Sequence, residues 1–325
     1  MKIIIRADAS VKIGSGHIMR CLTVAQQLQK SGHDVLFFML PLEGNVISYV
    51  KAQGFQTITS WQSVDIILID HYQIDFQLER SLREYANKIV VIDDLANRKH
   101  DCDVLLDQNI VENYQYRYDE LVPKTCKKLL GPQYLIMRDE FIQARQAMPK
   151  RTGKVERLLV FMGGTDPTHE TLKILEALQT AHFQKIHVVC GNGNVQKEEI
   201  QAICHRRGYP YHQQIDYMAQ LMNEVDFSIG AGGLTTWERC YVGLPSSSTI
   251  VADNQYETTK MTEKLGAVIN VGCHEKVTVE TYQQLLDYIV SHPEHLKSLS
   301  KKGLALTENQ GGSNPWIDEI LELKS

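Results

Sequence analysis

Residues 3–20, IIIRADASVKIGSGHIMR, decide the fold of this 325-residue chain. The continuous apolar run at 3–5 predicts a strand of a parallel sheet covered on both faces, because such strands lack alternation. A polar loop containing Gly14 and Gly16 follows. The next residues predict a helix that stops at Gly32 and has one apolar face, formed by Ile18, Cys21, Leu22, Ala25 and Leu28. Strand, glycine turn and helix together open a doubly wound α/β domain.

The same alternation of apolar runs and amphipathic segments continues along the chain. Further strands are predicted at 35–39, 66–69, 89–92, 104–106, 158–161, 186–189, 227–229 and 249–251. In the second half, helices are predicted at about 168–180, 195–207, 217–223, 233–242 and 255–265. The polar and basic stretch 143–156 is the best linker candidate. This pattern predicts an α/β protein with two Rossmann-like domains, at 1–147 and 155–311.

The last segment, 312–325, is predicted to form a helix over 316–323 after the sequence Gly311-Gly312-Ser313-Asn314-Pro315. Its apolar face has to pack against another part of the chain, because Trp316, Ile317, Ile320 and Leu321 all lie on it. The cleft between the domains is one place for it. The surface of the N-terminal domain is the other.

Composition and charge narrow the class of protein. Apolar residues make up 43% and charged residues 22%, which is ordinary for a soluble globular protein. The net charge of −5 argues against a general nucleic-acid binder, which needs a basic face. The first six residues are too short an apolar run for a signal peptide, and no stretch approaches the ~20 apolar residues of a membrane span.

The seven cysteines form no CxxC pair, and most lie in apolar runs. This pattern is typical of buried free thiols in a reducing compartment, so we expect a cytoplasmic protein. No long heptad pattern or large repeated apolar face demands a protein partner. We therefore expect a monomer.

Three glycine-rich turns each follow a strand and open a helix, at 6–17, 162–167 and 230–236. Glycine lets the backbone approach a ligand, and the helix dipole adds about half a positive charge there. One such turn is also typical of a plain tight connection. Three at matching positions in two domains indicate one anionic ligand held between two sheets. The binding residues expected there are Gly14, Gly16, Gly163, Gly164, Thr165, Gly232, Gly233, Leu234 and Thr235.

Cofactor-binding motifs are poorly matched. The run from Gly14 starts like GxGxxG, but Met19 takes the third glycine position. No P-loop has the required spacing of glycine and Lys-Ser or Lys-Thr. Asp101 and Asp103 stand two residues apart, yet a strand beginning at Asp103 fits them better than a metal site. We expect no cofactor and no metal.

His17 stands at the start of the first predicted helix, directly after the glycine turn. It is either a residue that caps the helix or a general base. A helix N-terminus disfavours the imidazolium, which would leave a neutral ring able to accept a proton. Asp8, across the same loop, either orients this ring or the substrate, or forms an Asx turn.

In the second half, Glu238 lies slightly more than one turn into the helix that opens at Gly233. A carboxylate there can accept two sugar hydroxyls, although an exposed helix glutamate is the alternative. Asn254 and Gln255 follow the predicted strand at 249–251, where polar side chains can reach sugar hydroxyls.

The segment from Arg6 to Arg20 resembles the N-terminal signature of the UDP-2,4-diacetamido-2,4,6-trideoxy-β-L-altropyranose hydrolases of pseudaminic acid biosynthesis. The resemblance covers nearly the whole chain. Other matching stretches are 40–44, 69–72, 92–94, 134–141 and 162–166.

The resemblance implies a GT-B fold, with two parallel sheets facing a cleft, akin to the bacterial lipid-linked N-acetylglucosaminyltransferase of peptidoglycan synthesis. It implies that the C-terminal domain binds UDP, that Glu238 holds the ribose, and that Gly163 to Thr165 lie near the diphosphate. It assigns catalysis to His17. Sugar contacts are implied at Tyr72 and Gln255, and Arg20 belongs to the same signature as His17. One departure is that Gly232-Gly233 replaces serines expected in some members, which leaves only backbone N–H groups for the phosphate.

The function expected from these features is hydrolysis of that UDP-sugar to UDP and the free sugar. His17 takes a proton from water, which attacks the anomeric carbon and inverts it. The leaving diphosphate is stabilised by helix N-termini without a metal. Three alternatives stay open: a glycosyltransferase on the same fold, a hydrolysing 2-epimerase and a non-catalytic UDP-sugar-binding protein.

Overall fold

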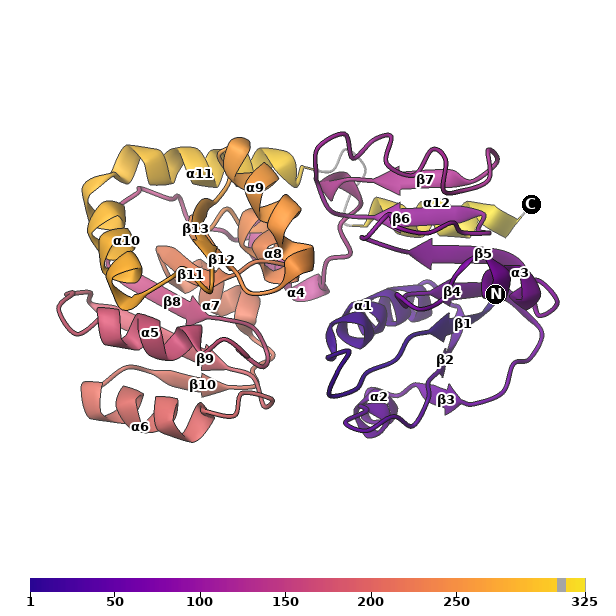
Figure 1. Ribbon diagram of the computed structural model, residues 1–325, viewed down its shortest axis with the longest axis horizontal. Helices are drawn as coiled ribbons and strands as arrows, with labels where there is room; N and C mark the ends of the chain where they lie inside the picture. Colours follow the sequence, from indigo (N-terminus) through magenta and orange to yellow (C-terminus); the bar gives the residue numbers. More distant parts are fainter. Residues whose placement is uncertain (309–313, 325) are drawn as a thin grey trace. The chain divides into compact units, whose positions relative to one another are not determined.

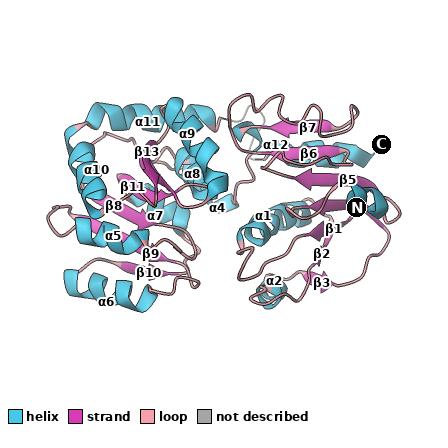
Figure 2. Cartoon of the chain, viewed as in Figure 1, coloured by secondary structure: helices cyan, strands magenta, loops and turns pink. Residues whose placement is uncertain are grey.

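The computed structural model describes residues 1–308 and 314–324. The chain divides into two compact units, each an α/β layered structure (Figures 1 and 2). Unit 1 contains residues 1–109, 113–137 and 314–324, and unit 2 contains residues 110–112 and 138–308. The expected α/β class with two parallel sheets is confirmed.

Unit 1 is built on a seven-stranded sheet with the order β3-β2-β1-β4-β5-β6-β7, and all neighbouring strands are parallel (Figure 1). The strands are β1 (Lys2–Arg6), β2 (Asp34–Phe38), β3 (Gln56–Ile58), β4 (Val64–Ile69), β5 (Ala86–Ile92), β6 (Val104–Asp107) and β7 (Lys127–Leu130). The strand order reverses between β1 and β4. In a doubly wound sheet, the loops beyond that reversal form the usual ligand crevice.

Helices cover both faces of this sheet. They are α1 (Gly16–Lys30), α2 (Ile47–Ala52), α3 (Phe76–Leu82) and α12 (Pro315–Leu321), with short 3-10 turns η1 (Pro132–Tyr134) and η3 (Glu322–Lys324). Alternate residues of each strand explain the two cores. Ile3 and Ile5 of β1 pack in the cluster that contains α1 and α12, whereas Ile4 packs in the opposite cluster with α3.

The C-terminal helix α12 is part of the core of unit 1. Trp316 is fully buried in the same cluster as β1 and α1. Just before the helix, Asn314 Oδ1 accepts hydrogen bonds from the backbone N of Met137 and from Trp316 Nε1, both 3.1 Å long. The predicted start of this segment, Gly311-Gly312-Ser313, lies outside the described residues.

Unit 2 has a six-stranded parallel sheet with the order β10-β9-β8-β11-β12-β13. Its strands are β8 (Arg157–Phe161), β9 (Lys185–Cys190), β10 (Tyr211–Gln213), β11 (Phe227–Ala231), β12 (Ser246–Ile250) and β13 (Ile269–Cys273). Its helices are α4 (Asp139–Gln146), α5 (Glu170–Ala177), α6 (Lys197–Arg207), α7 (Met218–Glu224), α8 (Leu234–Tyr241), α9 (Tyr256–Lys264), α10 (Val279–Ser291) and α11 (Pro293–Leu306), with the 3-10 turn η2 (Asp253–Gln255). Here the order reverses between β8 and β11.

The division between the units differs from the expected boundary at residue 147. Residues 138–147 belong to unit 2, because α4 is a packed helix rather than a linker. Phe141 is completely buried, Asn223 Nδ2 donates to the carbonyl of Ala144 over 2.8 Å, and Arg145 Nη1 donates to the carbonyl of Tyr241 over 2.7 Å.

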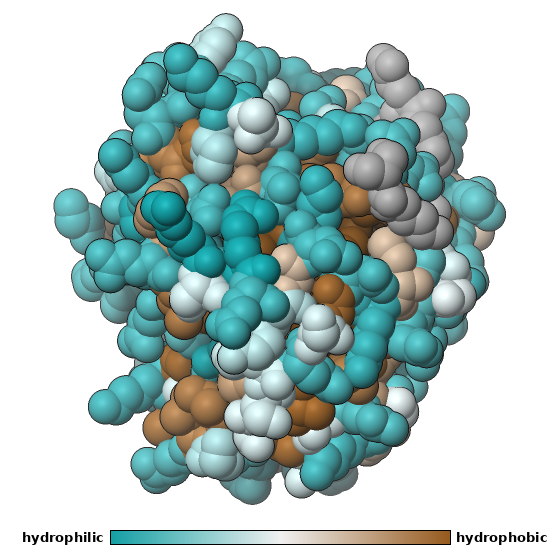
Figure 3. Space-filling model, turned by 90° about the vertical axis from the view of Figure 1, so that its right-hand side faces the viewer, coloured by the Kyte–Doolittle hydropathy of each residue, from teal (hydrophilic) through white to brown (hydrophobic). Residues whose placement is uncertain are grey.

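The surface drawn in Figure 3 is mostly hydrophilic, and apolar residues emerge on it in separate groups. None of the described helices combines the length and apolar character needed to cross a membrane.

We predict that Trp316→Ala destabilises unit 1 by about 3–5 kcal/mol, because it removes a large buried side chain and leaves a cavity. Urea unfolding followed by circular dichroism measures the effect. The matched control is Asp318→Ala, which changes an exposed residue of the same helix and should leave the transition in place. An unchanged midpoint for Trp316→Ala would contradict the assignment of α12 to the core.

Candidate active site

The loops beyond the strand reversal of unit 1 carry the residues around His17. The loop after β1 leads through Gly14 into α1, and Asp70 follows β4 directly. Gly14 has a φ of +77°, a conformation that favours glycine, and its N–H closes the loop by donating to the carbonyl of Ser10 over 2.8 Å. At Gly16, the first residue of α1, an added Cβ would meet no atom within 4 Å.

The His17 ring is held by a buried carboxylate. Its Nδ1 lies 2.7 Å from Asp70 Oδ1. Arg20, one helical turn further along α1, donates to both oxygens of Asp70, through Nε over 2.9 Å and Nη2 over 2.7 Å. The Asp70 carboxylate is therefore bonded by two basic side chains from the same face of α1.

The electrostatics of this cluster keep Asp70 ionised. Burial raises the pKa of its carboxyl, but Arg20 and His17 lower it by more, and the resulting pKa lies well below the usual range. An ionised Asp70 accepts the Nδ1 proton of the ring, so the neutral tautomer has its lone pair on Nε2. Ser15 occupies the N-cap position of α1, so His17 is not the helix cap. Its geometry fits a base whose orientation is fixed by a carboxylate.

Asp8 does not orient the His17 ring, which was one of the roles expected for it. Its carboxylate does not contact His17 among the recorded contacts of the described residues. It accepts from Arg6 Nη2 over 2.7 Å and from the backbone N of Leu40 over 2.8 Å, and lies 3.3 Å from His71 Nε2. Burial raises its pKa, but His71 and Arg6 lower it by more, to well below the usual range. Asp8 therefore ties the ends of β1, β2 and β4 together.

Tyr72 packs edge-on against the His17 ring, with 4.5 Å between ring centroids. The structure thus brings together four of the residues singled out in unit 1: Gly16, His17, Arg20 and Tyr72. Asp70, which holds two of them, had no assigned role, although it lies in the matching stretch 69–72.

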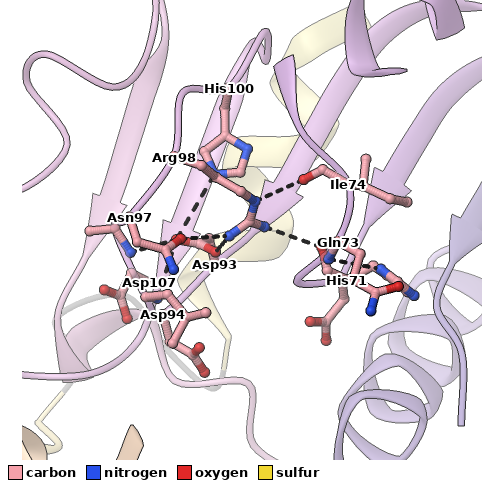
Figure 4. A network of polar contacts seen from close by, with 12 residues as sticks. His71, Gln73, Ile74, Asp93, Asp94, Asn97, Arg98, His100 and Asp107 are labelled. Carbon is pink, nitrogen blue, oxygen red and sulfur yellow. Dashed lines mark hydrogen bonds and ion pairs between the residues drawn. The ribbon is translucent and has the colours of Figure 1, made fainter. Parts of the chain in front are cut away.

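Sequence reasoning also missed a buried network next to this cluster, at the ends of β5 and β6 (Figure 4). Asp93 accepts from Arg98 Nη1 over 2.6 Å, and Asp107 accepts from Arg117 Nη1 over 3.0 Å. Arg98 also donates to the carbonyl oxygens of His71 and Ile74, as Figure 4 shows. A 3.5 Å contact from Arg20 Nη1 to Asp94 Oδ2 joins this network to the His17 cluster.

Asp107 is the unusual carboxyl of this network. Burial raises its pKa to about 7, with Asp94 and Asp93 adding to the rise and Arg117 opposing it. The hydroxyl of Tyr118 lies 3.2 Å from Asp107 Oδ2 and 3.0 Å from Asp93 Oδ2. Two carboxyls close together at one hydroxyl group explain why one of them keeps its proton more readily.

In unit 2, the turn after β11 leads directly into α8. Gly233 is the N-cap, at a φ of +90°, and no side chain caps the helix. Gly232 stands where a serine is expected in some family members, and steric crowding explains the glycine. A Cβ there would lie 2.9 Å from Thr259 Oγ1 and 3.0 Å from Gln255 Oε1, so a serine would require these neighbours to shift. Leu234 and Thr235, the first residues of the helix, are partly exposed.

The turn after β8 differs from the expected helix N-terminus. Helix α5 begins only at Glu170, and the Asp166 carboxylate accepts from the backbone N of Glu170 and of Thr171, each over 2.9 Å. This carboxylate already satisfies the first donors of α5 and offsets its dipole. Anion binding at Gly163 to Thr165 would therefore rely on the N–H groups of the turn itself. Gly163 and Gly164 have open space where a side chain would stand.

Glu238 is not an exposed helix residue. Its side chain is 6% exposed and accepts from Arg138 through Nη2 over 2.9 Å and Nε over 3.3 Å. Gln255 Oε1 accepts from the backbone N of Val251 over 3.0 Å, which places its side chain against the Gly232-Gly233 turn. Asn254 is exposed in η2, beside a cavity of about 600 Å³ lined in part by Asp253, Tyr256 and His274. Arg138 is a partner that the spacing of the sequence did not reveal.

Comparisons with known proteins identify the family of the chain. The family model of the glycosyltransferase family 28 C-terminal domain matches residues 158–311. A UDP-2,4-diacetamido-2,4,6-trideoxy-beta-L-altropyranose hydrolase of Campylobacter jejuni is 32% identical over 237 residues, which cover 69% of this chain and 82% of the relative. The chain belongs to this hydrolase family.

Two further proteins are similar to this chain, one in sequence and one in structure. An uncharacterized protein of Methanocaldococcus jannaschii is 29% identical over 75% of this chain, and the chain spans about half, 54%, of its length. The crystal structure of MurG from Acinetobacter baumannii matches 99% of both chains with 15% identity and a TM-score of 0.65. This likeness concerns the fold, and the expected GT-B class of the hydrolase family member is confirmed.

We predict that the stability of unit 1 declines as the pH rises from about 4 to 7. In this window an unfolded aspartate, with a pKa of about 3.9, has lost its proton, whereas the folded Asp107, with its pKa of about 7, still holds it. The unfolded chain then binds fewer protons, so raising the pH favours unfolding until Asp107 ionises in the folded state too. Asp107→Asn should flatten the decline in urea midpoint, and Asp318→Asn should not.

An Asp107→Asn protein with the same pH slope as the wild type would contradict the raised pKa of this carboxyl. The comparison uses the difference between the two slopes, because carboxyl groups far from Asp107 titrate equally in both proteins.

Proposed function

We propose that the chain hydrolyses a UDP-sugar, UDP-2,4-diacetamido-2,4,6-trideoxy-β-L-altropyranose, to UDP and the free sugar in pseudaminic acid biosynthesis. Membership of the hydrolase family supports the substrate class. The observation that carries the reaction type is the His17–Asp70–Arg20 cluster at the strand reversal of unit 1. A neutral imidazole oriented by a carboxylate is suited to activate water.

In the proposed step, water is the nucleophile and UDP the leaving group. His17 Nε2 takes a proton from water while the water oxygen forms a bond to the anomeric carbon. The bond from this carbon to the diphosphate oxygen breaks. The sugar inverts, because water and UDP occupy opposite faces. Asp70 accepts a hydrogen bond from the Nδ1–H of the ring and stabilises the imidazolium. Arg20 holds the Asp70 carboxylate in place.

Unit 2 binds the nucleotide in this proposal. The uncapped N-terminus of α8, at Gly233 to Thr235, and the turn at Gly163 to Thr165 donate N–H groups to the diphosphate. The N–H of Gly232 already donates to the carbonyl of Thr249 over 2.9 Å, so in this proposal Gly232 only allows close approach of the ligand. These donors and the helix dipole stabilise the charge that develops on UDP, so the reaction as proposed uses no metal.

The ribose and the sugar have separate contacts. Glu238 accepts ribose hydroxyls, and Arg138 orients its carboxylate. Tyr72, Asn254 and Gln255 contact the sugar. Within the proposal, Gly14 and Gly16 let the loop after β1 approach the sugar, and Asp8 supports that loop without touching the reacting atoms.

The setting of the proposed enzyme follows from its cysteines. Six of the seven free cysteines are buried and Cys273 is partly exposed, which suits a reducing compartment. We therefore propose a cytoplasmic enzyme. We further propose that it is a monomer that acts on a small molecule and water.

Replacing His17 tests the base directly. His17→Asn and His17→Leu should lower kcat for UDP release from the diacetamido sugar nucleotide by about 10²- to 10⁴-fold, the usual contribution of a positioned base. Binding of UDP alone should stay close to that of the wild type, because its proposed contacts lie in unit 2. Full hydrolytic activity in either variant would exclude His17 as the base.

Glu238→Ala should raise KM more than it lowers kcat, because the ribose contact exists before and during reaction. A loss of about tenfold in affinity corresponds to one hydrogen bond to a charged group. Steady-state kinetics and titration with uridine measure it, with the exposed Glu257→Ala as the control. Unchanged affinity for uridine in Glu238→Ala would rule out the ribose contact.

A glycosyltransferase is the second candidate, favoured by the likeness to MurG and by the family 28 domain match. Incubation of the UDP-sugar without an acceptor separates the two. A hydrolase releases one free sugar for each UDP, whereas a transferase turns over little. NMR of the product in isotopically labelled water also exposes an epimerase through inversion at C2, and a non-catalytic binding protein shows no turnover.

A further inference from the structure

Arg239 is a fully buried cation whose recorded hydrogen bonds all go to neutral oxygens. From Nη2 it donates to the carbonyl of Ala231 over 3.0 Å, to Thr236 Oγ1 over 3.1 Å and to Ser248 Oγ over 2.9 Å. From Nη1 it reaches Thr235 Oγ1 over 3.3 Å. Its Nε is buried and has no hydrogen-bond partner within residues 1–308 and 314–324.

No carboxylate among the described residues forms a recorded ion pair with this guanidinium. Glu238 precedes it in the chain, but its carboxylate is bonded to Arg138. Burial lowers the pKa of Arg239 to about 10, with Glu238 and Cys240 opposing the fall, so the group stays protonated at neutral pH. A buried charge without a counter-charge is costly to fold, and an anion nearby would offset that cost.

The guanidinium lies directly behind the turn that opens α8. A Cβ on Gly230 would clash with Arg239 Nη1, so glycine is needed there for the cation to fit. The carbonyl that Arg239 binds, that of Ala231, is two residues before the N-cap Gly233. The uncapped helix N-terminus and the buried guanidinium thus add positive potential to the same short turn.

We propose that Arg239 is a positioning residue that supplies fixed positive charge behind the α8 turn and so makes this turn selective for a diphosphate. This inference rests on the proposed function. Arg239 does not touch the ligand, but holds the turn through Ala231 and strengthens its field. As UDP leaves, negative charge on its terminal phosphate grows, and a fixed cation favours that state over the intact substrate.

A purely structural role is the competing explanation, because Arg239 also joins α8 to β11 and β12. The two roles differ in what they do to a ligand without phosphate. Loss of structure displaces α8, which also carries Glu238, the proposed ribose contact, and so weakens binding of UDP and uridine alike. Loss of charge weakens binding of UDP and spares uridine.

The test measures binding of UDP and of uridine by calorimetry in the full-length wild type, Arg239→Lys, Arg239→Met and Arg239→Gln. Lysine keeps the charge, methionine keeps the apolar length, and glutamine keeps an amide donor for Ala231. We expect both neutral variants to lose about tenfold or more in UDP affinity, while the affinity for uridine changes less than about twofold. A tenfold loss is about the size expected when one unit charge behind the turn is removed. Arg239→Lys should retain most of the preference for UDP.

Equal losses for UDP and uridine in the neutral variants, or UDP affinity unchanged in them, would overturn the inference. If the methionine variant fails to fold, the glutamine variant decides, and uridine binding reports whether its site is intact. A wild type that binds UDP no better than uridine also overturns it. A wild type that prefers UDP but releases no sugar from the UDP-sugar refutes the proposed function and leaves the charge inference to be judged on binding alone.

Discussion

The carboxylate of Asp70 is the interaction on which the geometry of unit 1 depends. It stands buried at the end of β4, where an ionised group needs counter-charges. Both come from α1, because His17 and Arg20 are three residues apart and share one helix face. For them to reach β4, α1 has to begin beside the end of β1. This requirement explains the long loop with a positive φ at Gly14, which brings the start of the helix to the strand reversal.

At its strand reversal, unit 2 has the opposite distribution of charge to unit 1. In unit 1, the central buried group is an anion surrounded by cations. In unit 2, the helix N-terminus after β11 is uncapped and a buried guanidinium lies behind it. The turn after β8 is neutralised instead, since Asp166 occupies the first donors of α5. The two glycine turns of unit 2 therefore differ in their electrostatics, and the α8 turn has the more positive surroundings.

Sequence patterns predicted the interior of both sheets and missed their edges. The nine expected strands all lie in the centre of the sheets, where burial on both faces produces continuous apolar runs. The four missed strands, β3, β7, β10 and β13, are the outer strands of the two sheets. Their residues are largely half-buried or exposed, as in Tyr211–Gln213, so composition does not distinguish them from loops. Packing of the neighbouring strand decides their conformation.

For the candidate site too, the sequence patterns identified some residues and missed others. Local patterns identified the glycine turns, His17 and Glu238, because a turn and the helix after it are adjacent in sequence. Their partners were not visible, since Asp70 is 53 positions from His17 and Arg138 is 100 positions from Glu238. Asp8 was linked to His17 because both lie in one loop, but that loop spreads over the ends of three strands and Asp8 binds elsewhere.

The buried charges themselves argue for function rather than stability. Replacing a buried ion pair with apolar side chains is often neutral or stabilising, so a chain selected for stability alone has little reason to keep one. Two groups of these buried charges lie at the strand reversals, around Asp70 in unit 1 and behind α8 in unit 2. A proton-accepting ring needs an oriented carboxylate, and a leaving diphosphate needs fixed positive charge. The cost of burying these groups is explained if the two units divide the proposed reaction, with proton transfer in unit 1 and charge stabilisation in unit 2.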